Sequence, residues 1–171
     1  ELGDARLALA ALRHEIELTQ DEIAQIEHRM HQPIPRVDLG VQLRGIATAA
    51  LDISDGLLGD LKHILNQSKV DALIWIDQLP KSAILIKQDP LIQNQFAACG
   101  GDDYEICFTA NSRERDVIEK ISNTLNLSLT RIGQITAIKN SAANMEILTS
   151  DGKPLCEDDS VALMKSFDHF K

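Results

Sequence analysis

The sequence predicts an α/β fold, a two-layer sandwich in which helices flank a mixed β-sheet. Short segments with alternating apolar and polar residues, such as VDALIWID at residues 70–77, are typical of strands. Between them lie longer segments whose apolar residues recur every three or four positions, which is the period of a helix that buries one face. The 171 residues are enough for one domain with a hydrophobic core.

The first part of the chain, residues 1–35, is predicted to be a helical lead-in followed by a linker. Asp4 precedes apolar residues at helical spacing, so we expect it to cap a first helix. Thr19 and Glu22 have the spacing of a capping box at the start of a second helix. The prolines of PIPR, at 33–36, end that helix and favour an extended connection.

Helical and strand patterns then alternate to the end of the chain. Ser112 precedes an apolar helical pattern and is expected to cap it. An Asp-Gly pair after MEILT predicts a tight turn. The predicted helices cover residues 39–46, 57–65 and 112–125, and the predicted strands cover residues 49–53, 70–77, 104–109, 128–138 and 145–149.

The composition limits the classes of function. There are 26 acidic and 17 basic side chains, for a net charge of −9, which disfavours binding to nucleic acids or to an anionic membrane surface. The three cysteines lack CxxC spacing, so we interpret them as reduced thiols of a cytoplasmic protein. The sequence contains no apolar run of transmembrane length and no signal-peptide pattern, so we expect no membrane association.

Two carboxylates and a hydroxyl lie at the predicted strand-to-helix junction in ALDISDGLLGDL, at residues 50–61. Ser54 or Asp55 could cap the following helix. Capping does not account for Asp52, which falls within the apolar strand pattern, where an unpaired charge is costly. Two neighbouring carboxylates also suit Mg²⁺, which is commonly held by one or two carboxylates together with phosphate oxygens and water. Both interpretations remain open.

A second acidic stretch, CGGDDYEICFT, begins at Cys99. Its glycines could bring the backbone close to a ligand or end the preceding helix, and Asp102 then stands at the start of a strand. A solvated acidic turn is the alternative. Near the C-terminus, Phe167 in SFDHF could dock on the core or stack on a flat ligand. The sequence contains neither a P-loop nor a GxGxxG motif.

Three segments in order, PIPRVDLGVQLRGIATAALDISDGLLGDLKHIL, GGDDYEICFT and SFDHF, resemble the C-terminal part of bacterial thiamine-monophosphate kinases. These enzymes belong to the aminoimidazole ribonucleotide synthetase-like superfamily. The resemblance implies that Asp52 and Asp55 bind Mg²⁺, that Ser54 contacts ATP, and that Asp102 and Phe167 contact thiamine monophosphate. The family usually has Glu where this chain has Asp102, so the carboxylate is one methylene shorter here.

The resemblance further implies ATP- and Mg²⁺-dependent phosphorylation of thiamine monophosphate to thiamine diphosphate, by direct in-line transfer with several Mg²⁺ ions. We expect residues 1–171 to form a single C-terminal domain. The N-terminal ATP-binding domain, which also forms the homodimer interface, is expected to lie outside this chain, so the chain alone should be inactive. Two alternatives stay open: another ATP-dependent enzyme of the superfamily that acts on a different small substrate, and a non-catalytic binding module.

Overall fold

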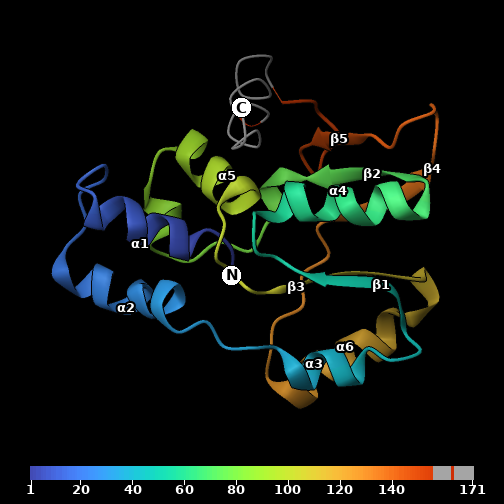
Figure 1. Cartoon of the computed structure of the whole chain (residues 1–171), viewed down its shortest axis with the longest axis horizontal. Helices are drawn as coiled ribbons and strands as arrows, with labels where there is room; N and C mark the ends of the chain where they lie inside the picture. The colour runs from blue at the N-terminus through green and yellow to red at the C-terminus, as the bar shows by residue number, and fades with distance from the viewer. Residues whose placement is uncertain (156–162, 164–171) are drawn as a thin grey trace.

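The computed structural model describes residues 1–155 and Leu163, which form helices packed around short strands (Figure 1). The α-helices are α1 (Asp4–Leu12), α2 (Gln20–His31), α3 (Val37–Gln42), α4 (Leu57–Ser68), α5 (Pro90–Cys99) and α6 (Arg115–Leu125). The strands are β1 (Ala47–Asp52), β2 (Val70–Trp75), β3 (Ile106–Ala110), β4 (Gly133–Ala137) and β5 (Met145–Leu148). Single 3₁₀ turns cover Ile76–Gln78, Leu85–Lys87 and Ser112–Glu114.

The five strands form two separate sheets in the part of the chain that the structure describes. β1 pairs antiparallel with β3. In the second sheet, the central strand β2 pairs antiparallel with β4 and parallel with β5, so this sheet is mixed, as predicted. The alternating pattern identifies each strand but does not reveal that the strands divide between two sheets.

Helix α4 joins the two sheets because it contacts both β1 and β2. Its apolar side chains, Leu57, Leu58 and Leu65 among them, are almost completely buried in the main core. Figure 1 shows α3 and α6 together on the side of the β1–β3 pair that faces away from the three-stranded sheet. There they form a second, smaller core with β3, built on Leu39 and Ile121. The β1–β3 pair therefore lies between two apolar layers.

The helix caps confirm one prediction and correct two. Thr19 and Glu22 form the predicted capping box at the start of α2. Asp4 does not cap α1: the N-cap is Gly3, and Asp4 is the first helical residue, buried with its carboxylate accepting a hydrogen bond from the Ser82 hydroxyl at 2.6 Å. Ser112 does not cap α6 either, because it lies in the 3₁₀ turn that precedes the helix. Neither correction moves a helix by more than a few residues.

Two further predictions concern the state of the cysteines and the absence of a helix that could cross a membrane. Cys99 and Cys107 are buried free thiols, and Cys156 lies outside the described residues. Among residues 1–155 and Leu163, the structure contains no helix with the length and apolar character needed to cross a bilayer.

Candidate functional site

The two acidic segments singled out in the sequence lie side by side at the end of the β1–β3 pair. The strand register places Asp52 opposite Ile106. The pairing continues past both strands, because the Ile53 amide donates to the Glu105 carbonyl at 2.8 Å and the Tyr104 amide donates to the Ile53 carbonyl at 2.7 Å. Residues just over fifty positions apart in the sequence thus form one continuous strip of backbone.

Glycines permit this close approach. The Asp102 amide donates to the Ser54 carbonyl at 2.8 Å, and a Cβ added to Gly101 would lie only 2.8 Å from that same oxygen. A Cβ on Gly56 would lie 2.8 Å from the carbonyl of Cys99, and Gly56 also has a positive φ of 102°. Side chains at these positions would force the segments apart. Gly101 therefore allows the two segments to approach each other, and the predicted helix end is found at its neighbour Gly100, which is the C-cap of α5.

The capping interpretation of Ser54 and Asp55 is wrong. The N-cap of α4 is Gly56, and no side chain caps this helix end. Instead, the carboxylate of Asp60 accepts hydrogen bonds from the amides of Ser54 and Asp55, at 2.8 Å and 3.0 Å. Asp60 is only 6% exposed and lies in the first turn of α4, where the helix dipole favours a negative charge. Sequence analysis missed Asp60, although an acidic residue in a first helical turn is a recognisable signal.

Asp60 holds the backbone of Ser54 and Asp55, and the side chain of Asp55 is directed outward. Asp52 and Asp55 are both exposed. Asp52 is the last residue of β1, within the strand as predicted, but its charge is not buried, because burial alternates along β1 and Asp52 is on its exposed side. Within residues 1–155 and Leu163, no side chain or amide donates a hydrogen bond to either carboxylate. Within the described part of the chain, their exposed oxygens are therefore open to a ligand.

These carboxylates suit Mg²⁺, but they do not form a complete metal site. The described part of the chain has no group of three or more His, Cys, Asp or Glu side chains placed to hold a metal ion. Hard oxygen ligands are what Mg²⁺ prefers, and one or two protein carboxylates suffice when phosphate oxygens and water fill the other positions. Asp52 and Asp55 could therefore supply only part of a Mg²⁺ site, with phosphate oxygens and water as the other ligands, and in the described residues they do not form a self-contained metal cage.

On the opposite segment, Asp102 and Tyr104 have left-handed backbones, with φ of 68° and 49°. This conformation is uncommon for residues other than glycine and is strained for a bulky side chain. Both side chains are exposed, and the Tyr104 hydroxyl lies 3.5 Å from an Asp102 carboxylate oxygen. The residue between them, Asp103, is buried instead. A strained backbone that carries exposed side chains often marks a functional site.

Four of the five predicted site residues, Asp52, Ser54, Asp55 and Asp102, are thus brought to one end of the β1–β3 pair. Ser54 is half-buried, and in the sequence it lies between the exposed Asp52 and Asp55. The fifth residue, Phe167, lies outside the described residues. The arrangement offers separated negative charges on two adjoining segments, which can hold cations and groups bound to cations.

Comparison with known proteins identifies relatives that match nearly the whole chain. No family model matches it. It is 37% identical over 171 residues to thiamine-monophosphate kinase of Haemophilus influenzae, and the aligned region covers 99% of this chain and 50% of that protein. It is 34% identical over 170 residues to thiamine-monophosphate kinase of Escherichia coli K12, with 98% and 50% coverage. The chain spans about half the length of the curated relatives that it matches.

Solved structures agree with the sequence relatives. The crystal structure of thiamine-monophosphate kinase from Stenotrophomonas maltophilia matches with a TM-score of 0.77 and 37% identity, over 90% of this chain and 48% of that one. A structure described as AaThiL complexed with AMPPCP and TMP matches with a TM-score of 0.67 and 28% identity, over 91% of this chain and 46% of that one. The predicted α/β fold class with a mixed sheet is confirmed.

Proposed function

Because the chain is a homologue of the thiamine-monophosphate kinases, we propose that it is the C-terminal domain of such an enzyme. The complete enzyme would transfer the γ-phosphoryl group of ATP to thiamine monophosphate and so form thiamine diphosphate. This proposal includes an N-terminal ATP-binding domain outside the present chain, a homodimer formed through that domain, and a cytoplasmic location. The relatives are twice as long as the matched region, which supports a second domain.

The observation that supports the proposal best is the meeting of the two acidic segments. Asp52 and Asp55 come from one segment and Asp102 from the other, and backbone hydrogen bonds lock the segments together. A transfer between two phosphate-bearing molecules needs positive charge between them, and carboxylates are the side chains that recruit it. The likeness to a kinase structure complexed with AMPPCP and TMP supports the same pair of ligands here.

Each side chain then has a distinct task. Asp52 and Asp55 would hold Mg²⁺, and Mg²⁺ when bound neutralises phosphate charge and aligns the reacting oxygens. The Ser54 hydroxyl would contact ATP, and the hydrogen bond from the Ser54 amide to Asp60 fixes the backbone that carries it. Asp102 would contact thiamine monophosphate, whose thiazolium ring is a cation. The acceptor is already a phosphate with ionised oxygens, so the transfer needs little help from a general base.

The proposal is tested by supplying the complete gene product that contains this chain with ATP, Mg²⁺ and thiamine monophosphate. We expect stoichiometric formation of ADP and thiamine diphosphate, resolved by chromatography. Phosphorylation of a different small molecule, with thiamine monophosphate left unchanged, would favour another ATP-dependent enzyme of the superfamily. Tight ligand binding with no turnover of any nucleotide would favour a binding module.

A further inference from the structure

The segment from Asp102 to Glu105 sends its side chains alternately outward and inward. Asp102 and Tyr104 are exposed, the latter by 40%, whereas Asp103 is 8% exposed and Glu105 is half-buried. The two outward residues are those with left-handed φ. A bulky tyrosine keeps such a backbone only where the surroundings impose it. Two inward contacts, at Asp103 and at Glu105, provide those surroundings.

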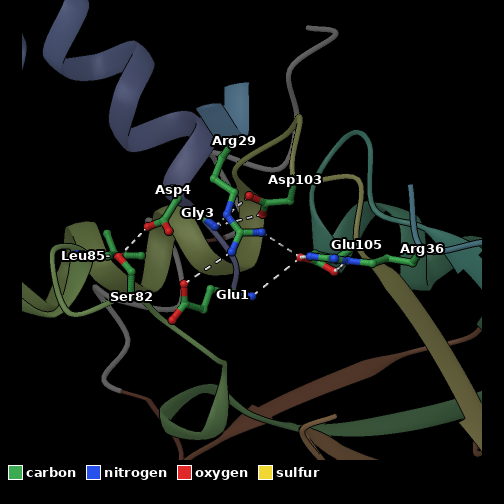
Figure 2. Close-up of polar contacts among 9 residues, drawn as sticks. All are labelled: Glu1, Gly3, Asp4, Arg29, Arg36, Ser82, Leu85, Asp103 and Glu105. Carbon is green, nitrogen blue, oxygen red and sulfur yellow. Dashed lines mark hydrogen bonds and ion pairs between the residues drawn. The ribbon is translucent and has the colours of Figure 1, made fainter. Parts of the chain in front are cut away.

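Asp103 is the first anchor. Both of its carboxylate oxygens accept from the amide of Gly3, at 3.0 Å and 2.9 Å (Figure 2). Gly3 is itself fixed, because a Cβ there would lie 2.8 Å from the backbone of Phe96 in α5. Burial raises the pKa of Asp103 to about 7, and the Gly3 amide opposes that rise only in part. The anchor thus ties the segment to the junction of α1 and α5.

Glu105 is the second anchor. Its carboxylate accepts two hydrogen bonds from Arg36, at 2.7 Å and 2.6 Å, and a third from Arg29 at 3.2 Å. Figure 2 shows the guanidinium groups of Arg29, which lies in α2, and Arg36, which precedes α3, both directed at the Glu105 carboxylate. Burial acts to raise the pKa of Glu105, but the bonds to Arg36 and the nearby positive charges outweigh it and hold the pKa below its ordinary value. A bidentate, partly buried pair fixes geometry better than an exposed one does.

We propose that Tyr104 is a second acceptor-binding residue, displayed beside Asp102 by the inward anchors at Asp103 and Glu105. This inference rests on the proposed function. The acceptor combines a cationic thiazolium ring with a flat pyrimidine ring, and a tyrosine face attracts cations and stacks on flat rings. With its hydroxyl 3.5 Å from the Asp102 carboxylate, Tyr104 places an aromatic surface next to a negative charge. That pairing matches a ligand that is both aromatic and cationic.

The strain at Tyr104 makes the proposal testable, because function and stability then move in opposite directions. Tyr104→Gly removes the ring and also relieves the left-handed backbone. We expect the complete gene product carrying this substitution to melt at the same temperature or higher. Its dissociation constant for thiamine monophosphate, measured by calorimetry without ATP, should rise about threefold to thirtyfold, as loss of a stacking or cation–π contact would cause. Tyr104→Phe keeps the ring and should bind within about twofold of wild type.

The anchor is tested with Glu105→Gln, which removes the charge that Arg36 and Arg29 bind. Alone it should weaken acceptor binding and leave the ATP KM unchanged. Combined with Tyr104→Gly it should add little, because Glu105 acts through the residue that it positions. The matched control is Glu114→Gln, which breaks the exposed ion pair with Arg113 and should change neither constant.

The outcomes separate this inference from the proposed function. If the wild-type protein makes no thiamine diphosphate and binds no thiamine monophosphate, both the proposed function and the role of Tyr104 are overturned. If the wild-type protein makes thiamine diphosphate but the Tyr104→Gly variant binds the acceptor as tightly as wild type, only the role of Tyr104 is overturned. Loss of stability in Tyr104→Gly with unchanged acceptor binding also overturns it, because the ring would then be a structural element.

Discussion

Replacing Gly101 with alanine should force apart the two segments that form the site. The added Cβ would lie 2.8 Å from the Ser54 carbonyl oxygen, whereas ordinary contact begins near 3.4 Å, so the backbones must separate by about 0.6 Å. The same oxygen accepts the 2.8 Å hydrogen bond from the Asp102 amide, which this movement would weaken. Overpacking costs about 1–3 kcal/mol and a lost hydrogen bond about 1 kcal/mol, so we expect a loss of roughly 2–4 kcal/mol in unfolding free energy.

Two other glycines separate steric contact from backbone conformation. Gly45 has a φ of 75° but open space around it, so Gly45→Ala measures the backbone cost alone, about 1–2 kcal/mol. Gly40 lies in α3 with its nearest neighbour 3.9 Å from an added Cβ, so Gly40→Ala should stabilise the protein by about 0.5–1 kcal/mol. Urea denaturation followed by circular dichroism gives all three values. If Gly101→Ala left the unfolding free energy unchanged, or raised it as Gly40→Ala should, the close approach of the segments would be refuted.

Four further predictions concern the site. Asp52→Asn and Asp55→Asn should each strongly reduce Mg²⁺-dependent turnover of the complete gene product with little change in melting temperature, because both carboxylates are exposed; normal turnover with a lower melting temperature would contradict a metal role. Asp102→Asn should raise the KM for thiamine monophosphate and not that for ATP, while Asp102→Glu should be tolerated; a shift confined to ATP would place Asp102 elsewhere. Burial raises the pKa of Asp103 to about 7, so its folded form binds more protons than its unfolded form. Its contribution to stability should be complete below about pH 4 and be lost as the pH rises through 7, at about 1.4 kcal/mol for each pH unit between those values. Asp103→Asn should therefore flatten this part of the plot of urea midpoint against pH. The present chain alone should form no thiamine diphosphate, and sustained turnover by it would contradict the two-domain proposal.

Local signals in the sequence predicted most of the helices and strands. The capping box of Thr19 and Glu22 is such a signal, because both partners lie within one helical turn. The alternation in residues 70–77 similarly marked β2, since the period of a strand is a property of the strand itself. Features that depend on one segment alone were therefore predictable.

The missed features depend on contacts between distant segments. Asp4 looked like a cap, but Gly3 takes that position because its amide is bound by Asp103, one hundred residues away. The exposure of Asp52 likewise follows from which face of β1 packs on the core. Asp60 is the exception, because it lies only six and five residues from the Ser54 and Asp55 amides that it binds, and its place in the first turn of α4 is a local signal that was overlooked. Sequence could indicate that the carboxylates were unusual, but not which of them are bound internally.

The most decisive measurement is a crystal structure of the complete gene product with Mg²⁺, a non-hydrolysable ATP analogue and thiamine monophosphate. We predict Mg²⁺ about 2.0–2.1 Å from oxygens of Asp52 or Asp55, with the phosphates of both ligands beside it and the thiamine moiety against Asp102. The alternative result would be nucleotide and acceptor bound away from the end of the β1–β3 pair, with Asp52 and Asp55 facing only solvent. That result would contradict the assignment of these two segments as the phosphoryl-transfer site.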